Sequence, residues 1–500
     1  MNSKGKTMDV KRKMHCDILI VGGGNAGLVS AIEAKDRGAN VLLIEKAPKK
    51  ARGGNTRLSG GLFRVAFPGG TKDLAPLLEG TNLPKGEVDI EPYSADDYFN
   101  KVIRMSEGLS DRRFTEITVS KSLETVQWMK EQGVQWDLSP VNMVRFGNRL
   151  FWPASTEVLM ALGAGEGLAE MLYGIAERHG IEVLYETAAQ SLITNADAKV
   201  CGIIAKEKDG YLQIDARSVI LTCGGFQANP AWRRRYLGAN WDLVKLRGTR
   251  YDTGEGIRMA VDIGAQVAGH WGGCHASIAS EDSPMLEANA VGASRYSYPF
   301  CVMVNRDGLR FVDEGEDFMV FTYAKFGKEI LKQPGSVAFQ VFDSKVFHLL
   351  TPKYQNAVKV ESDSLEALAA EIDINVKQFL RTVKEFNEAI SDEIPFLSYK
   401  HDGRCTRGLN PNKTNWAQRI DTPPFHAYAV VCGLTMTYGG LKTNEKAQVI
   451  DTADRPIKGL YAVGEITGGF YYHNYPAGTG LVRGAVMGRI AAAEAVGQNQ

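Results

Sequence analysis

A short segment near the end of the chain places side chains that can donate or accept protons beside a flexible, glycine-rich backbone. Residues 468–481 read GGFYYHNYPAGTGL, with Tyr471, Tyr472, His473 and Tyr475 ahead of a glycine-rich run. A tyrosine hydroxyl can donate a hydrogen bond to a carbonyl oxygen, but it acts as a base only if its pKa, about 10 when unperturbed, is lowered. Histidine titrates close to neutral pH already. The segment predicts a site where a carbonyl group is polarised or a proton is moved.

A second glycine-rich segment, at the start of the chain, has the spacing of a dinucleotide-binding turn. The apolar run CDILIV at 16–21 predicts a buried parallel strand, and Gly22, Gly24 and Gly27 then follow in the G-x-G-x-x-G spacing. Next come a helical pattern and a second apolar strand that ends at Glu45. The glycines permit a tight turn and a close approach of pyrophosphate, while the acid accepts hydrogen bonds from a ribose. The complete unit predicts a bound dinucleotide.

The loop after this acid distinguishes FAD from NAD. Residues 52–61 read RGGNTRLSGG, a second glycine-rich loop that simple NAD binding does not need. It resembles the loop beside the flavin in the fumarate reductase and succinate dehydrogenase flavoprotein family. Membrane-bound members carry there a histidine that bonds covalently to FAD, and Asn55 occupies its position here. The resemblance implies FAD held non-covalently.

Further motifs extend this resemblance over nearly the whole chain. They are DARSVILTCGGF at 215–226, TGEGIRMAVDIGAQ at 253–266, NRDGLRFVDE at 305–314, GLYAVGE at 459–465 and the AGTGL glycine turn that opens a terminal helix. In the family the start of that helix points at the flavin, where its dipole stabilises the reduced anion. The glycine turn and the resemblance together predict cofactor contacts at Gly22, Gly24, Asn25, Ala26, Gly27, Glu45, Lys46, Gly53, Gly54, Asn55, Thr56, Ser59, Gly60, Gly61, Ala189, Cys223, Gly224, Gly464, Glu465, Gly478, Thr479, Gly480 and Leu481.

The motifs also give a domain plan of class α/β. We expect a Rossmann-like FAD-binding domain, discontinuous over 14–270 and 436–500, with an inserted α+β capping domain at 271–435 that carries the substrate. Residues 1–13 form a polar leader whose basic cluster is expected to be a solvated tail. A helical stretch is expected over 364–390, and residues 136–155 are expected to form a loop near the cleft.

The substrate-binding residues of family fumarate reductases are replaced. Phe318 stands where the proton-donor arginine is expected, Met436 where a histidine is expected, and Tyr475 in place of a second arginine. The segments GEDF, TYAKFG, GCHA and GGFYYHNYPAGTGL instead resemble the tricarballylate dehydrogenase branch. That branch converts tricarballylate to cis-aconitate and passes electrons to a separate membrane-associated iron–sulfur partner. The Y-P-x-G-x-G pattern is also similar to that of 3-ketosteroid dehydrogenases, which polarise a ketone with tyrosines.

The candidate catalytic residues follow from this chemistry, in which a base removes the α-proton and the β-hydrogen leaves as hydride to the flavin. They are Tyr475, His473, Tyr323 and His275. The candidate substrate-binding residues are Tyr472, Arg145 and Arg149, the two arginines because a carboxylate needs cationic partners.

Composition limits the partners and the location. The formal net charge of zero argues against nucleic acid, and no run reaches the ~18 apolar residues of a membrane span. None of the seven cysteines forms a C-x-x-C pair, so we expect no metal site, and a reducing, cytoplasmic location is predicted. Peripheral attachment to a membrane would come through the electron-transfer partner.

Three functions are compatible with the sequence. The first is a dehydrogenase or reductase of a carboxylate or carbonyl compound, of the tricarballylate type. The second has the same chemistry but a steroid or other apolar ketone as substrate. The third is a non-catalytic binding protein built on a flavoprotein scaffold, which would have no use for all of the FAD motifs.

Overall fold

The chain divides into two compact units. The computed structural model describes residues 10–80, 87–140, 143–153 and 158–498. Unit 1 comprises Met1–Leu237, Thr249–Gly273 and Thr437–Gln500, and unit 2 comprises Gly238–Gly248 and Cys274–Met436. Residues 238–248 thus belong to unit 2, whereas the sequence analysis assigned them to the FAD-binding domain. The reason is that β13 (Lys245–Leu246) pairs with Gly433 and Leu434 of β18 (Phe425–Leu441).

Unit 1 is built around a large sheet with a parallel centre. The strand β1 (Val10–Val21) pairs in parallel with β2 (Val41–Ile44) and with β12 (Gly210–Leu221). The outer strands are β9 (Glu182–Leu184), β10 (Ala188–Thr194), β11 (Val200–Glu207), β19 (Gln448–Ile450) and β20 (Pro456–Ala462). Ile18, Leu19 and Ile20 are fully buried, as expected of a strand covered on both faces. The α/β prediction is confirmed.

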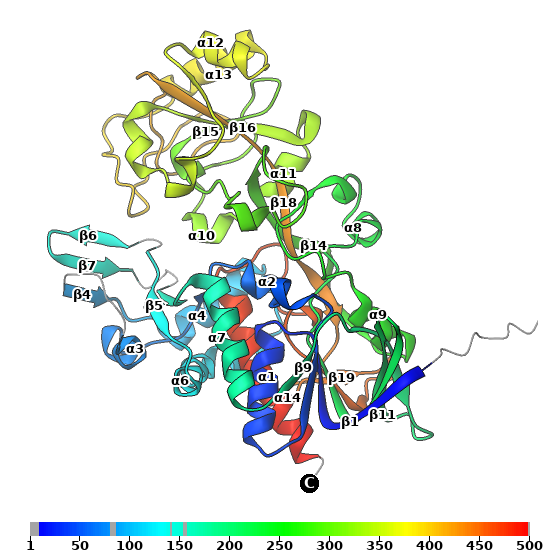
Figure 1. Ribbon diagram of the computed structural model, residues 1–500. Coiled ribbons are helices and arrows are strands. Elements are labelled where there is room, and N and C mark those ends of the chain that lie inside the picture. Colours follow the sequence, from blue (N-terminus) through cyan, green and yellow to red (C-terminus); the bar gives the residue numbers. More distant parts are fainter. Residues whose placement is uncertain (1–9, 81–86, 141–142, 154–157, 499–500) are drawn as a thin grey trace, which may run out of the picture. The chain divides into compact units, whose positions relative to one another are not determined.

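Three helices pack together beside this sheet (Figure 1). They are α1 (Asn25–Asp36), α7 (Ala164–Arg178) and α14 (Thr479–Gly497). The small residues of α14 allow a close approach, because a Cβ added at Gly488 would lie 2.9 Å from the Ala26 carbonyl oxygen of α1. The packing brings the last helix of the chain against the first.

The remaining elements of unit 1 surround these layers. They are η1 (Lys49–Ala51), α2 (Gly54–Arg57), β3 (Leu62–Phe63), α3 (Thr71–Leu78), β4 (Glu87–Ile90), α4 (Ala95–Met105), α5 (Arg112–Ser120), α6 (Ser122–Gln132), β5 (Trp136–Leu138), β6 (Val144–Phe146), β7 (Arg149–Trp152), β8 (Leu159–Ala161), α8 (Pro230–Tyr236), α9 (Glu255–Asp262) and η8 (Gly464–Ile466).

Two sequence expectations about irregular segments are wrong in part. Within the leader at 1–13, residues 1–9 lie outside the described residues, but β1 begins at Val10. Arg12 and Lys13 pair there with Leu212 and Gln213, because β12 offers them a hydrogen-bonding partner.

The expected loop at 136–155 contains the strands β5, β6 and β7, while residues 141–142 and 154–155 lie outside the described residues. Its Gly147–Asn148 pair is the two-residue turn of a hairpin, with Phe146 opposite Arg149. The chain breakers in this segment thus join strands rather than end them.

Unit 2 combines a mainly antiparallel sheet with helices, as the α+β prediction requires. Its strands are β13, β15 (Val302–Val304), β16 (Val337–Phe342), β17 (Val360–Ser362) and the parts of β14 (Val267–Ser280) and β18 that lie in the unit. The helical elements are η2 (Trp241–Leu243), η3 (Ala288–Val291), η4 (Tyr298–Phe300), α10 (Met319–Thr322), α11 (Phe326–Leu331), η5 (Pro334–Ser336), η6 (Ser344–Leu349), η7 (Pro352–Tyr354), α12 (Leu365–Glu371) and α13 (Val376–Glu388).

The predicted helical stretch at 364–390 is two helices. Ser364 caps α12 by accepting a hydrogen bond from the Ala367 amide, and Asn375 caps α13 by accepting one from the Gln378 amide. Asp373, with φ 55°, separates them. Phe379, Val383 and Phe386 of α13 then pack into the core of unit 2.

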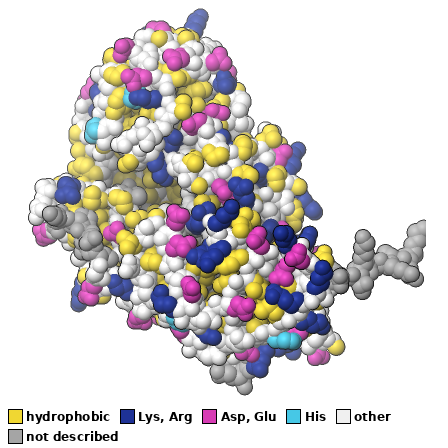
Figure 2. Space-filling view, in the orientation of Figure 1, with side chains coloured by type: hydrophobic (Ala, Val, Ile, Leu, Met, Phe, Trp, Pro, Cys, Tyr) yellow, Lys and Arg dark blue, Asp and Glu magenta, His cyan; other side chains and the backbone are white. Residues whose placement is uncertain are grey.

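The surface carries both signs of charge. Lys and Arg side chains are interspersed with Asp and Glu over the face shown in Figure 2, in keeping with a formal net charge of zero. Within the described ranges, none of the helices has both the length and the apolar character needed to cross a membrane.

Candidate functional site

The first glycine turn leaves a space of methyl size at the start of α1. A Cβ added at Gly27 would lie 2.0 Å from the Gly22 carbonyl oxygen, so that glycine serves the packing of helix against sheet. At Gly24 the nearest atom would be the Thr56 Oγ1, 3.7 Å away, and the backbone has an ordinary φ of −79°. A phosphate that approaches the helix N-terminus can use this space.

The acid after the second strand is buried beside the same turn. The Glu45 carboxylate accepts hydrogen bonds from the Gly23 amide at 2.8 Å and the Ala47 amide at 2.7 Å, and burial raises its pKa. A carboxylate has further lone pairs that a ribose hydroxyl can use. Next to it, the Lys46 ammonium donates to Thr253 and to Glu255 at 2.8 Å.

The second glycine-rich loop connects this turn to the late motif. The Asn25 amide of α1 donates to Thr56 Oγ1 at 2.9 Å. Asn55 accepts from the Thr249 amide at 2.8 Å and donates to the Glu465 carboxylate at 3.2 Å. In the same loop, Gly53, Gly54 and Gly61 have positive φ, and Ser59 accepts from the Gly61 amide. Segments more than four hundred residues apart in sequence thus meet within unit 1.

Two carboxyl groups meet a glutamine beneath this loop. Glu465 accepts from the Thr437 amide at 3.0 Å, and Gln227 donates to Asp252 at 2.7 Å and to Glu465 at 3.5 Å. Burial raises the pKa of Glu465 to about 8, and burial together with the charge of Glu465 raises the pKa of Asp252 well above its usual value. The pair therefore holds a proton at neutral pH.

This pair makes the stability of the FAD-free chain depend on pH. The folded-state pKa of Glu465 lies above the usual 4.5, so the native state keeps a proton that the unfolded chain releases. The free energy of unfolding should therefore fall by a few kcal/mol as the pH rises from about 4.5 to about 8. Glu465→Gln should flatten this slope, as measured by urea unfolding at several pH values. An unchanged slope would show that the proton is held elsewhere.

The terminal helix begins with a hydrogen bond between one of its amides and the Tyr475 hydroxyl. Gly478 has φ 78°, which lets the chain turn into α14, and the Gly480 amide donates to the Tyr475 hydroxyl at 3.0 Å. The Leu481 carbonyl accepts from the Asn25 side chain at 2.8 Å, so the two glycine turns are linked. Because the Gly480 N–H is directed at the Tyr475 oxygen, an oxygen that approached this point would accept its hydrogen bond from the Tyr475 O–H.

Burial decides which role Tyr475 can have. It raises the pKa of Tyr475 above the usual 10, so the phenol stays protonated at neutral pH. Tyr475 can therefore polarise an oxygen by donating a hydrogen bond, whereas a base would need a lowered pKa. Its neighbour Tyr471 is buried, with its hydroxyl 3.0 Å from Thr479 Oγ1 and its ring against Tyr475.

The histidine of the segment has a partner that the sequence analysis missed. The His473 amide donates to His270 Nδ1 at 3.2 Å, the two rings lie 4.7 Å apart, and Tyr472 stacks on His270. His473 has φ 57°, and its Nε2 is 3.9 Å from a Glu107 carboxylate oxygen. The segment GHWGGCHA contains both His270 and His275, and this repetition of histidine was the available signal.

In unit 2, two predicted catalytic residues lie together. The His275 ring meets the Tyr323 ring edge-on at 4.9 Å between centroids, and Tyr296 is 5.1 Å from Tyr323. Burial, together with the charge of Arg247, lowers the pKa of His275 to about 3, so the imidazole is neutral. Arg247 is a second residue that the sequence analysis missed. Its only signal was a second cation, directly after the stretch LVKL at 243–246.

Phe318 packs against aromatic rings, and the predicted arginines lie on an exposed hairpin. Phe318 packs against the rings of His401 and Trp416. Arg149 pairs with Asp89 of the adjacent strand β4, and both Arg149 and Arg145 are exposed on the β6–β7 hairpin. The hairpin thus presents the two predicted substrate-binding arginines to solvent.

The remaining predicted cofactor residues lie in or beside the large sheet. Ala189 is a buried residue of β10, and burial raises the pKa of the Cys223 thiol to about 12, so the thiol is protonated. A Cβ at Gly224 would meet the Asp252 carboxyl group at 2.5 Å. Gly464 has φ 83° and starts η8, which places Glu465 in the buried network.

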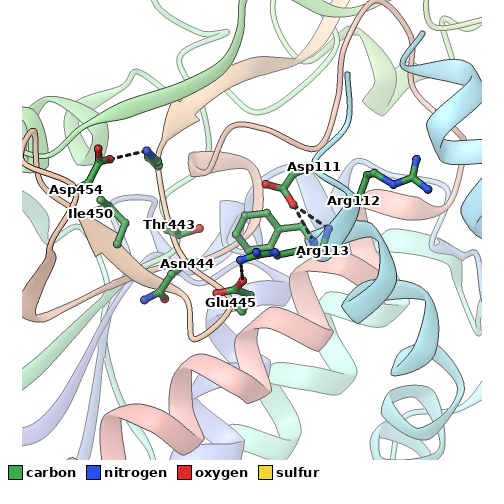
Figure 3. Close-up of a pocket in the computed structure, with 10 residues that line it drawn as sticks. Asp111, Arg112, Arg113, Thr443, Asn444, Glu445, Ile450 and Asp454 are labelled. Atoms are coloured by element: carbon green, nitrogen blue, oxygen red, sulfur yellow. Dashed lines mark hydrogen bonds and ion pairs between the residues drawn. The ribbon is translucent and has the colours of Figure 1, made fainter. Parts of the chain in front are cut away.

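A separate hollow of about 490 Å³ in unit 1 contains none of the predicted residues (Figure 3). Arg113 and Glu445 form an ion pair on its wall, and Lys442 pairs with Asp454. Asp111 caps α5 by accepting from the Arg113 and Phe114 amides. Arg113, Glu445, Lys442 and Asp454 thus already have partners within the chain.

Comparison with known proteins gives consistent matches along the chain. A family model described as an FAD binding domain matches residues 17–481. A probable fumarate reductase, Ifc3, of Shewanella frigidimarina is 28% identical over 95% of this chain and 74% of its own length. A 3-oxosteroid 1-dehydrogenase of Mycolicibacterium smegmatis is 25% identical over 95% of this chain and 96% of its own. The open conformation of a flavocytochrome c3 fumarate reductase superposes with a TM-score of 0.72, at 26% identity, over 97% of this chain and 79% of that one.

Proposed function

The chain belongs to the FAD binding domain family, and on that premise we propose that it oxidises or reduces a carbon–carbon bond next to a carboxylate, with tricarballylate as the leading substrate. It is an enzyme, an FAD-dependent oxidoreductase that acts on CH–CH bonds. The membership also confirms the prediction of a Rossmann-like FAD-binding domain.

The residues of unit 1 fit FAD. The space at Gly24, the buried acceptor Glu45 and the helix start at Gly478 would receive the pyrophosphate, a ribose and the flavin end, respectively. Asn55 uses both ends of its side-chain amide in hydrogen bonds to the protein, which supports non-covalent binding. When bound, FAD supplies the hydride acceptor of a dehydrogenation or the hydride donor of a reduction.

One observation carries the assignment of chemistry, namely the 3.0 Å hydrogen bond that the Gly480 amide donates to the Tyr475 hydroxyl oxygen. A hydroxyl whose oxygen accepts from an amide is polarised toward donating its own proton, so the Tyr475 O–H can stabilise the negative charge that develops on a carbonyl or carboxylate oxygen when the α-proton leaves. The protonated state of Tyr475 suits this role. His473, which lies two residues earlier in a partly exposed turn, is the candidate to take up the proton.

The replaced residues favour a substrate other than fumarate. Phe318, Met436 and Tyr475 remove the arginine and histidine groups of family fumarate reductases, and the YYHNYPAGTG segment resembles the tricarballylate dehydrogenase branch. Dehydrogenation of tricarballylate would give cis-aconitate, two protons and two electrons. A separate acceptor, of which a membrane-associated iron–sulfur protein is the candidate, would then reoxidise the enzyme in the cytoplasm.

A ketone is the second candidate, since the Tyr475 hydroxyl could equally donate to a ketone oxygen. An anaerobic titration separates the two substrates. Tricarballylate should bleach the visible flavin absorption of the purified protein, whereas a 3-ketosteroid should leave it unchanged. The reverse result would replace the carboxylate by a ketone, and a protein that stayed oxidised with both would overturn both substrate proposals while leaving the FAD assignment intact.

A further inference from the structure

Unit 2 contains a buried arginine whose hydrogen bonds all go to neutral groups. Arg247 is 5% exposed, and its Nη1 donates to Ser277 Oγ at 2.7 Å and to Thr435 Oγ1 at 2.6 Å. Its Nη2 donates to Asn289 Oδ1 and to Ser294 Oγ, both at 3.0 Å. Within the described part of the chain no carboxylate pairs with it, and its Nε has no hydrogen-bond partner. A buried guanidinium without an anion is costly, so its charge calls for an anionic group from outside the chain.

Two further cationic side chains, Arg295 and Lys353, lie near Arg247. Burial lowers the pKa of Arg295, whose Nε also lacks a partner within the described residues, although Asp282 offsets part of its charge. Desolvation and the charges of Arg247 and Arg295 lower the pKa of Lys353. Tyr296 contributes a buried hydroxyl without a partner among the described residues, and its ring lies 5.7 Å from the Arg247 guanidinium. This cluster of Arg247, Arg295, Lys353 and Tyr296 therefore has more hydrogen-bond donors and positive charge than its neighbours have acceptors.

A relay connects this arginine to a predicted catalytic residue. Ser277 Oγ receives the Arg247 hydrogen bond and lies 3.1 Å from His275 Nδ1. Because arginine can only donate, the serine hydroxyl is available to donate to Nδ1. The proton of the neutral imidazole would then reside on Nε2, and the ring would present a hydrogen-bond donor.

We propose that Arg247, acting through Ser277, holds His275 as a neutral Nε2–H donor to an oxygen of the substrate, and that the unpaired charge of Arg247 selects an anionic oxygen. Arg247 and Ser277 are positioning residues, and His275 is the group that contacts the substrate. The inference rests on the proposed function and specifies its substrate class as a carboxylate rather than a ketone.

The test compares acids with their methyl esters, which have the same carbon skeleton but no charge. Tricarballylate, succinate and fumarate, each with its methyl ester, are added to the FAD-containing protein, and the dissociation constant of each is measured by equilibrium dialysis. Arg247→Gln should weaken binding of the acid by about 100-fold and leave binding of the ester unchanged. Arg247→Lys, which keeps the charge, should recover about tenfold of this loss. Ser277→Ala should weaken acid binding by about tenfold.

A structural arginine provides the control. Arg404 of unit 2 is also buried but is held by Asp392 and by the carbonyls of Ala417 and Ile394, so Arg404→Gln should lower the melting temperature without changing the preference for acid over ester. If Arg247→Gln weakened the binding of acid and ester equally, or changed neither, the inference would be wrong while the proposed function stood. A native protein that bound none of the three acids would overturn the proposed substrate class. If chloride, at the same ionic strength, displaced the acids as effectively as the acids displace one another, the site would be one for inorganic anions instead.

Discussion

Gly24→Ala should strongly weaken FAD binding while leaving the fold intact. A methyl group at this position meets no atom closer than 3.7 Å in the chain, and the backbone already has a φ that alanine adopts. The methyl would, however, occupy the space through which a pyrophosphate approaches the start of α1. We expect the dissociation constant for FAD to rise by at least about 100-fold, equivalent to about 2.7 kcal/mol, with the melting temperature of the FAD-free protein unchanged.

The neighbouring glycine supplies the contrast for this experiment. A Cβ at Gly27 would lie 2.0 Å from the Gly22 carbonyl oxygen and 2.6 Å from Thr222 Oγ1, so Gly27→Ala should destabilise the FAD-free protein itself. FAD fluorescence quenching and thermal melting of both variants give the two quantities. Tight FAD binding by the Gly24→Ala variant would mean that the phosphate does not pass this residue.

The second large effect is expected at the start of α14, where Tyr475→Phe removes the hydroxyl that faces the Gly480 amide. Loss of one donor to a developing negative charge typically costs about 100-fold in turnover, and we expect a fall in kcat of this size. FAD should remain bound, because the lost hydrogen bond lies within the chain. The measurement is the anaerobic rate of flavin reduction, read alongside the flavin content.

Tyr471 is the matched control for this variant. It lies in the same segment, is buried, and has its hydroxyl 3.0 Å from Thr479 Oγ1. Tyr471→Phe should reduce stability by about 1 kcal/mol and leave kcat within a few-fold. Equal activity of the Tyr475→Phe variant and the native protein would remove Tyr475 from the mechanism, and equal losses in both variants would indicate general damage to the segment.

Much of the cofactor site could be predicted from the sequence because its requirements are local. The spacing of Gly22, Gly24 and Gly27 and the acid at Glu45 follow from the geometry of one strand, one turn and one helix. The late GLYAVGE motif and the terminal glycine turn added the other end of the site through a family resemblance. The glycine and polar residues at 136–155 led to the wrong prediction of a loop, because Gly147 and Asn148 suit a hairpin turn as well as a loop.

The sequence by itself determined the fold class, the cofactor and the kind of bond that reacts, because each depends on short motifs whose parts are close along the chain. Only the tertiary structure decided the protonation of Tyr475 and Glu465, which follows from burial, and the partners of His473 and His275. Arg247 meets Thr435 only because β13 pairs with β18 across nearly two hundred residues of sequence. No pattern within a single element carries that information, since strand pairing over such a distance is set by the packing of the whole unit.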